Sequence, residues 1–291
     1  PPPPPPAPAA PPPPPGPPPP PHPADASAAP VPPLEPGQPP LAFLVDYDGT
    51  IARTDVSDSL MAAFVTADWE SRVAEYDAGL TGSRALMGWE VGRITADPAE
   101  LRATAAAQPH DATFVAFAEA CREAGIPVEV VSDGFGFFIA PALEAMGLDD
   151  VPVVTADTRF GPDGRPTIAF PNGHPACFVC GTCKRNRVLA YQATGRRVVF
   201  VGDGESDRYA AGYADVVFAK HALVEICLRN GWPFERWTEF SEITRWLGAR
   251  LAAWRADPAG LAGIPPAVER RMFCGPEVWG PDRWNPVPVE P

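Results

Sequence analysis

Basic side chains, cysteines and long apolar runs are scarce in this chain. Lysine and arginine number 23 against 36 aspartates and glutamates, which gives a formal net charge of −13 at pH 7. Such an acidic protein is a poor partner for nucleic acid or an anionic membrane surface. Six cysteines in 291 residues are too few for a disulfide scaffold. No apolar run reaches the length of a membrane span, and no charged-then-apolar secretory segment opens the chain.

These absences favour a reduced, soluble, cytoplasmic protein without a nucleic-acid or membrane partner. The chain begins with proline instead of methionine, as a fragment or a processed product does. A missing N-terminus would hide any targeting signal, so the cytoplasmic location is an expectation for the sequence as it stands.

Proline, by contrast, is abundant and unevenly distributed. Of 42 prolines, 24 lie in residues 1–40, where proline and alanine leave few side chains for a core. We therefore expect residues 1–40 to be extended, polyproline-like and disordered. Residues 257–291 are again rich in proline and glycine and predict an irregular tail, with Trp279 and Trp284 packing on the body. The stretch between them, 41–256, suits one α/β domain with a small accessory unit.

The most informative motif is Asp46-Tyr47-Asp48-Gly49-Thr50, which directly follows the apolar run Leu41–Val45. Such a short run predicts a buried strand of a parallel sheet. Ligands bind beyond the carboxyl ends of such strands, where two carboxylates repel each other unless a cation or a shared proton relieves the charge. A bound Mg²⁺ would leave one aspartate as a nucleophile and the other as an acid and base, which is phosphatase chemistry. The pentad alone fits a calcium loop or an ordinary turn equally well.

Three further polar motifs follow along the chain. Val128–Val131 leads into Ser132-Asp133-Gly134, a strand that ends in a hydroxyl and a glycine turn. Lys184 opens a predicted helix. Val198–Val201 then leads into Gly202-Asp203-Gly204-Glu205-Ser206-Asp207, a strand that ends in acids. Four polar motifs in this order, three of them at strand ends, resemble the four motifs of the haloacid-dehalogenase superfamily of phosphatases.

The resemblance implies a role for each motif. Asp46 would attack phosphorus and form an aspartyl-phosphate, and Asp48 would protonate the leaving group and then activate water. The Ser132-Asp133-Gly134 turn would bind phosphoryl oxygens through its hydroxyl and its backbone N–H groups. Lys184 would neutralise charge on the nucleophile and on the phosphate.

The same resemblance implies a Mg²⁺ site at the strand ends. Asp46 and Asp203, with the backbone carbonyl of Asp48, would supply the hard oxygen ligands that this cation prefers. Asp207 would complete the site indirectly, through water or by orienting Lys184. The plainer interpretation of Asp207 is a charge at the N-terminus of the helix that follows.

Spacing predicts an accessory unit between the first two motifs. Asp48 and Ser132 are more than 80 residues apart, far more than one crossover helix requires. Residues 111–124 fit that crossover helix. The remaining insertion holds helical stretches at Ser57–Thr66, Trp69–Asp77, Ser83–Gly92 and Pro98–Ala106. It resembles the cap of the phosphoserine-phosphatase-like branch, which would exclude water and select the leaving group.

The predicted fold is therefore a doubly wound, parallel α/β sheet of the Rossmann-like, haloacid-dehalogenase type. Its core would comprise residues 41–55 and 109–256, and its helical cap residues 56–108.

Two strings narrow the resemblance. Residues 131–139 and 177–184 are similar to the branch that contains 2-hydroxy-3-keto-5-methylthiopentenyl-1-phosphate phosphatase of methionine salvage. The similarity covers roughly 41–250 and implies a Mg²⁺-dependent phosphomonoesterase acting on a small phosphorylated metabolite. Phosphoserine phosphatase, or another small-metabolite phosphatase or phosphotransferase of the superfamily, is the alternative. A catalytically silent phosphate-binding module is the non-enzyme alternative, and the retention of all four motifs counts against it.

The cluster His174-x-x-Cys177-x-x-Cys180-x-x-Cys183 permits three interpretations. Its ligand types fit a structural Zn²⁺ site that would close the loop before Lys184. Oxidation of a cysteine pair beside Lys184 would instead make the loop redox-sensitive. The ligands are unusually close together and no second cluster lies downstream, so we favour ordinary reduced cysteines. His110 and His221 are isolated and predict structural or surface histidines.

Overall fold

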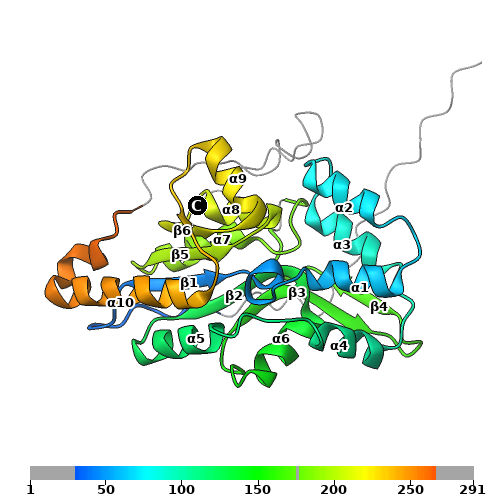
Figure 1. Cartoon of the computed structure of the whole chain (residues 1–291), viewed down its shortest axis with the longest axis horizontal. Coiled ribbons are helices and arrows are strands. Elements are labelled where there is room, and N and C mark those ends of the chain that lie inside the picture. Colours follow the sequence, from blue (N-terminus) through cyan, green and yellow to red (C-terminus); the bar gives the residue numbers. More distant parts are fainter. Residues whose placement is uncertain (1–29, 175–176, 267–291) are drawn as a thin grey trace, which may run out of the picture.

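The structure, a computed structural model, describes residues 30–174 and 177–266. Within these ranges seven strands form one sheet in the order β4-β3-β2-β1-β5-β6-β7 (Figure 1). The strands are β1 (Leu41–Val45), β2 (Val128–Phe135), β3 (Val153–Phe160), β4 (Pro166–Ala169), β5 (Arg197–Gly202), β6 (Val216–Ala219) and β7 (Glu235–Arg236). All neighbours pair in parallel except β3 and β4, which form an antiparallel hairpin. The prediction of a mainly parallel α/β sheet is confirmed.

Strand β1 lies at the centre because both of its faces are apolar. All five of its residues are fully buried, and it pairs with β2 on one side and β5 on the other. Side chains alternate along a strand, so Leu41, Phe43 and Val45 enter one hydrophobic cluster while Ala42 and Leu44 enter the other. The strand therefore holds its carboxyl end, and Asp46 after it, in a fixed place.

Helices cover both faces of the sheet (Figure 1). On the Phe43 side lie α5 (Phe114–Glu123), α6 (Gly136–Ala145) and α10 (Phe240–Ala256); on the Leu44 side lie α7 (Lys184–Gln192), α8 (Arg208–Ala211) and α9 (His221–Asn230). The chain leaves β1 toward β2 and later returns to pair β5 with the other edge of β1. The carboxyl ends of β1 and β5 thus form the switch point at which open α/β sheets bind ligands.

The insertion after β1 contains the four predicted helices, which we call the cap helices. They are α1 (Val56–Phe64), α2 (Glu70–Asp77), α3 (Ser83–Val91) and α4 (Pro98–Ala106). Leu60 of α1 and Leu101 of α4 are fully buried in the main hydrophobic cluster, whereas none of the residues of α2 is fully buried. Helices α1 and α3 contact strands of the sheet and α4 packs on α6, so these three helices anchor the insertion to the core. Its functional division from the core, at residues 56–108, stays a prediction.

Residues 30–40 correct the prediction of an unpacked segment that extends to residue 40. The buried guanidinium of Arg196 donates hydrogen bonds to the backbone carbonyls of Pro32 and Pro33, each at 2.8 Å. Pro39 and Pro40 are buried, directly before β1. Backbone carbonyls accept hydrogen bonds whatever their side chains, so a proline-rich composition did not prevent docking. The predicted disorder of residues 1–29 lies outside the described residues.

The predicted irregular tail is described only to residue 266. Its first part forms a short 3₁₀ segment, Pro258–Gly263, that is interrupted by a kink at Leu261 and Ala262, and Ile264 is buried in the main cluster. Trp279 and Trp284, which we expected to pack on the body, lie outside the described residues. Within the described ranges, no helix is both long enough and apolar enough to span a membrane.

Candidate active site

A cavity of about 330 Å³ lies beyond the carboxyl ends of β1, β2 and β5, between the sheet and the cap helices. Its volume is at the lower end of the range for small-molecule sites. The lining contains six of the predicted site residues, Asp46, Asp48, Ser132, Asp133, Gly134 and Asp203. The remaining two, Lys184 and Asp207, stand behind Asp46 and reach it through hydrogen bonds. Residues that are up to 161 positions apart along the chain thus meet at one sheet edge.

Lys184 is the centre of a buried ionic network. Its ammonium group donates to Asp46 Oδ1 at 2.7 Å, to Asp207 Oδ1 at 2.7 Å and to Ser206 Oγ at 2.8 Å, which uses all three of its N–H bonds. Burial alone would lower the pKa of Lys184, but the carboxylates of Asp207, Asp46 and Asp133 together raise it above its usual value. The lysine is therefore a fixed positive charge beside Asp46.

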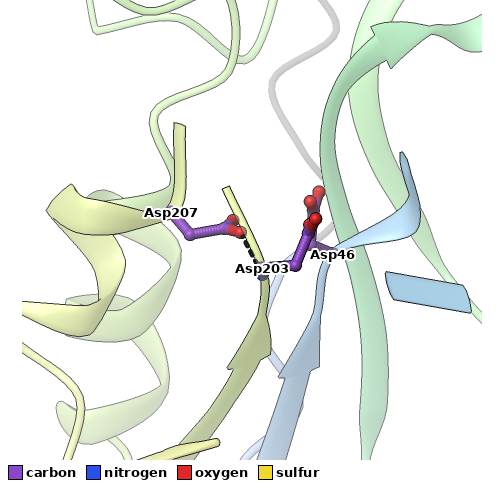
Figure 2. Close-up of side chains that lie close together, drawn as sticks. All are labelled: Asp46, Asp203 and Asp207. Atoms are coloured by element: carbon purple, nitrogen blue, oxygen red, sulfur yellow. Dashed lines mark hydrogen bonds between the residues drawn. The ribbon is translucent and has the colours of Figure 1, made fainter. Parts of the chain in front are cut away.

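Asp207 organises the loop after β5. Its Oδ2 accepts hydrogen bonds from the backbone N–H groups of Asp203, at 2.8 Å, and Gly204, at 3.0 Å, and the first of these is the dashed line in Figure 2. Its Oδ1 is bonded to Lys184. Both oxygens are thus occupied by this chain, which suits the indirect role that we expected for Asp207.

The two acids of the first motif are in different environments. Asp46 is 4% exposed, and within the described residues only its Oδ1 has a hydrogen-bond partner. Asp48 Oδ1 accepts a hydrogen bond from the backbone N–H of Val56 at 2.9 Å. Burial, followed by the charges of Asp55 and Asp46, raises the pKa of Asp48 well above its usual range. A raised pKa favours a protonated Asp48, which can donate to an oxygen in the cavity.

Two glycines make room for these carboxylates. Gly49 has a φ of +66°, and a Cβ built there would lie 2.1 Å from Asp203 Oδ2. A Cβ on Gly134 would lie 2.4 Å from Asp48 Oδ2. Neither position tolerates a side chain without movement of an acid, so the glycines of both turns are required by the close packing of the site.

The two polar side chains of the second motif contact different parts of the molecule. Ser132 is fully buried, and its Oγ accepts a hydrogen bond from the Gly134 backbone N–H at 2.8 Å. That N–H, which we expected to bind phosphate, is occupied in this structure. Asp133 accepts from the Ser83 hydroxyl at 2.6 Å and from the Thr182 backbone N–H at 2.5 Å. Its side chain therefore ties the start of α3 to the loop that presents Lys184.

The acids at the strand ends fit a divalent cation. Figure 2 shows Asp46 after β1 and Asp203 after β5, with Asp207 approaching from the side. One ligand oxygen from each of the three lies within 4.8 Å of the other two. Of the three carboxylates, those of Asp46 and Asp207 share the ammonium group of Lys184, and Asp203 forms no ion pair with it, so the cluster keeps an excess of negative charge. Hard oxygen ligands with excess negative charge suit Mg²⁺ better than softer transition metals.

Two residues at the site, Thr50 and His221, were given no site role from the sequence. Thr50 donates to Asp203 Oδ1 at 3.1 Å, and Nδ1 of His221 lies 3.1 Å from Asp203 Oδ2. His221 is thus at the site, although its isolation in the sequence had suggested a structural or surface role. It is the first residue of α9, and its backbone is left-handed, with φ of +46°. Nε2 of His110, which was also expected to be a structural or surface histidine, lies 2.8 Å from the Tyr47 hydroxyl.

The cysteine loop borders the site without converging on a metal. His174, Cys177, Cys180 and Cys183 line one small pocket beside Lys184. Among the described residues, only the aspartate cluster brings three ligand atoms within 4.8 Å of one another. A Zn²⁺ ion or a redox function in this loop stays a prediction, and the favoured interpretation is still that of ordinary cysteines.

A family model described as haloacid dehalogenase-like hydrolase matches residues 43–212. The chain belongs to this family. The matched range contains all eight predicted site residues, from Asp46 to Asp207. The predictions of a haloacid-dehalogenase-like fold and of a phosphatase of this superfamily are confirmed.

Curated relatives point to the same branch. A Brevibacillus brevis protein named 2-hydroxy-3-keto-5-methylthiopentenyl-1-phosphate phosphatase is 28% identical over 219 residues, which are 70% of this chain and 94% of the relative. A Geobacillus kaustophilus protein of the same name is 27% identical over 213 residues, again 70% of this chain and 93% of the relative.

Solved structures are similar in fold. A phosphoserine phosphatase with a phospho-aspartyl intermediate analogue has a TM-score of 0.55 at 16% identity and covers 72% of this chain and 99% of its own. A probable phosphoserine phosphatase from Vibrio cholerae has a TM-score of 0.56 at 19% identity, covering 75% of this chain and 67% of its own. At these identities the likeness establishes the fold alone.

Proposed function

We propose that this haloacid-dehalogenase family member is a Mg²⁺-dependent phosphomonoesterase that hydrolyses a small phosphorylated metabolite through an aspartyl-phosphate on Asp46. The observation that carries the proposal is the contact between Lys184 and Asp46. The ammonium group holds one carboxylate oxygen of Asp46 at 2.7 Å, and the second has no partner within the described residues. An oriented carboxylate with an open oxygen at a ligand cavity is suited to nucleophilic attack.

The roles of the other residues follow from their positions. Asp46 attacks phosphorus while the ester oxygen leaves, and Asp48 gives that oxygen its proton. Asp48, now ionised, takes a proton from water, which attacks the aspartyl-phosphate and releases phosphate. Ser132 binds a phosphoryl oxygen, and Lys184 offsets the negative charge of Asp46 and of the phosphate from behind Asp46, as expected from the family motifs. The raised pKa of Asp48 supports the first of its two roles.

Asp46 and Asp203, with the backbone carbonyl of Asp48, would hold the metal, and Asp207 would support them through Lys184. Bound there, Mg²⁺ would offset the charge that phosphate adds to a cluster already rich in carboxylates.

The names of the relatives make 2-hydroxy-3-keto-5-methylthiopentenyl 1-phosphate the first ester to test as substrate. Phosphoserine is the second, because the structural neighbours are named for it. A location in the cytoplasm, inferred from composition, is part of the same proposal.

Metal dependence tests the proposal directly. After extensive dialysis against EDTA, hydrolysis of p-nitrophenyl phosphate should fall to background, and Mg²⁺ should restore it. Ca²⁺ in excess should inhibit, because it takes more ligands at longer distances and can draw both oxygens of Asp46 into coordination. Full activity in EDTA would remove the metal from the mechanism.

A further inference from the structure

His221 has a backbone conformation that the packing of its side chain does not explain. Its φ of +46° lies in the left-handed region, which is unfavourable for a residue with a Cβ. Among the described residues, the other non-glycine residues with a positive φ are Leu261 and Ala262, in the kink of the segment Pro258–Gly263. The His221 side chain is 61% exposed, so burial of its ring does not offset the strain.

The His221 side chain belongs to the lining of the active-site cavity and contacts Asp203 there. Its Nδ1 lies 3.1 Å from Asp203 Oδ2. An ionised carboxylate only accepts hydrogen bonds, so the proton of this bond is on Nδ1 and the imidazole ring is the donor. Strained backbone conformations persist where the surrounding structure fixes them, and they cluster at active sites. The contact with Asp203 is therefore the feature of His221 to which we look for a function.

The first turn of α9 holds Asp203 at two points. The Leu223 backbone N–H donates to the backbone carbonyl of Asp203 at 2.7 Å, and His221 contacts the carboxylate of the same residue. The Leu223 side chain is fully buried in the hydrophobic cluster on the Leu44 side of the sheet, so this turn is fixed relative to the sheet. His221 therefore reaches Asp203 from a rigid support.

The carboxylate of Asp203 has one side-chain donor on each oxygen. The Thr50 hydroxyl donates to Oδ1 at 3.1 Å, and His221 donates to Oδ2. Donors on both oxygens oppose rotation of the carboxylate about its Cβ–Cγ bond. Each oxygen keeps a second lone pair with which it can bind a cation. Asp203 is thus oriented by this chain before any cation binds.

A direct bond from His221 to the metal fits less well. In the part of the chain that the structure describes, the ligand atoms that converge within 4.8 Å belong to Asp46, Asp203 and Asp207, and no histidine joins them. Imidazole also suits softer metals than Mg²⁺. Hydrogen bonds to a ligating carboxylate orient it, and loss of such a bond commonly lowers metal affinity by about tenfold or more. The position of His221 therefore favours an action through Asp203.

We propose that His221 is a positioning residue that holds the Asp203 carboxylate in the orientation that binds Mg²⁺. The inference rests on the proposed phosphatase function and deepens it, because it makes the metal site depend on a residue outside the four motifs. The strained backbone of His221 is then the cost of placing a donor beside Asp203.

Three variants of His221 separate the hydrogen bond from the backbone strain. His221→Ala removes the ring and keeps the strain, whereas His221→Gly removes both. His221→Asn keeps a nitrogen donor at the δ position, and asparagine adopts left-handed φ values more readily than most residues. Calorimetric titration with Mg²⁺, without substrate, should give a Kd about tenfold higher for the Ala and Gly variants and within about threefold of wild type for the Asn variant.

The Mg²⁺ dependence of p-nitrophenyl phosphate hydrolysis gives a second readout. The Mg²⁺ concentration for half-maximal activity should rise about tenfold in the Ala and Gly variants. Most of the lost activity should return at saturating Mg²⁺, because the nucleophile Asp46 and its contact with Lys184 are unchanged. Glu225→Gln, an exposed position on the same helix away from the lining, is the matched control and should leave both Mg²⁺ values unchanged.

The outcomes are distinguishable. If wild-type protein hydrolyses no phosphate ester, the proposed function fails, while the calorimetric comparison still tests His221; if it binds no Mg²⁺, both proposals fail. If wild-type protein is active with Mg²⁺ but His221→Ala binds the ion equally tightly, or His221→Asn binds it as weakly as His221→Ala, only the positioning role is overturned. Thermal melts in EDTA check that each variant is folded. Should His221→Ala not fold, the comparison of His221→Gly with His221→Asn decides by the same criteria.

Discussion

The carboxylates on the two sides of the cavity differ in their partners. We call the side at the carboxyl ends of the strands the sheet wall, and the side formed by the cap helices the cap wall. On the sheet wall, Asp46 and Asp207 share the Lys184 ammonium, and Asp207 also accepts two backbone N–H groups. On the cap wall, the lining acids Asp58, Asp77 and Glu90 form no ion pair within the described residues, although Glu90 is only 3% exposed. Within the described residues, the chain therefore supplies a counter-charge for the acids of the sheet wall and none for those of the cap wall.

The contrast suggests that the sheet wall carries out the reaction and that the cap wall affects which ester is accepted. Paired and hydrogen-bonded groups are held before the substrate arrives, which is what nucleophilic attack requires. Unpaired acids on the cap wall destabilise the fold when they ionise, because burial disfavours their charged form. We therefore expect changes on the sheet wall to abolish turnover and changes on the cap wall to alter substrate preference and stability.

The largest effect should come from the nucleophile on the sheet wall. Asp46→Asn keeps the size of the side chain but removes the charge that faces Lys184, and an amide does not attack phosphorus. We expect kcat to fall by about a thousandfold or more, as in other enzymes that lose a nucleophile. Steady-state hydrolysis of p-nitrophenyl phosphate measures this. Retention of more than about a tenth of wild-type kcat would remove Asp46 from its role.

A smaller loss should follow from crowding Asp203. Gly49→Ala places a Cβ 2.1 Å from Asp203 Oδ2 and should lower kcat and Mg²⁺ affinity by about tenfold or more, measured by Mg²⁺ titration of activity. Gly79→Ala is the control, since Gly79 has a similar φ of +70° but nothing within 4 Å of its Cβ. Both substitutions should cost about 1 kcal/mol of stability through the left-handed backbone. Equal activity in the two variants would contradict the close approach to Asp203.

We expect Glu90 on the cap wall to make the free energy of unfolding depend on pH. Burial and neighbouring acids raise the pKa of Glu90 from 4.5 to about 8, so between these values the folded protein holds a proton that the unfolded chain has lost. Stability therefore falls as pH rises across that window. Glu90→Gln cannot ionise, so its Tm should exceed that of wild type by a few degrees more at pH 8.5 than at pH 5.

Thermal melts at both pH values, with Glu100→Gln as the exposed control, measure the difference. A gap between Glu90→Gln and wild type that stays constant from pH 5 to pH 8.5 would show that Glu90 is not a buried, uncompensated acid.

The smallest effect is expected away from both walls. Deletion of residues 1–36 removes the Pro32 and Pro33 carbonyls that pair with the buried Arg196 guanidinium and should cost about 1–3 kcal/mol, with kcat unchanged within about twofold. Deletion of residues 1–29 keeps both carbonyls and should leave Tm within a few degrees of the full chain. Equal Tm values for the two truncated proteins would mean that the Arg196 contacts contribute nothing.

The acids of the sheet wall could be predicted from the sequence because each directly follows a strand. Asp46 follows directly from a five-residue apolar strand, and Asp203 follows from another, so strand ends alone place both at one edge. Lys184 was found through the resemblance of its motif to a family. The hydrogen bond that joins it to Asp46 depends on tertiary packing across 138 positions of the chain.

The acids of the cap wall could not be predicted from the sequence. Asp58, Asp77 and Glu90 occur on amphipathic helices, where an acid normally indicates a solvated face. Only the folding of three helices against the sheet turns them toward one cavity. The docking of residues 30–36 was missed for a related reason. Amino-acid composition does not show which backbone carbonyls accept hydrogen bonds.

The most direct test of the account is to trap the covalent intermediate. Wild-type protein, mixed with Mg²⁺ and a rapidly hydrolysed phosphate ester and quenched in acid within milliseconds, should carry one phosphate that hydroxylamine removes. Peptide mass spectrometry should place it on Asp46, and Asp46→Asn should carry none. Phosphate on Ser132, or rapid turnover without any phosphorylated protein, would contradict the assignment of Asp46 as the nucleophile.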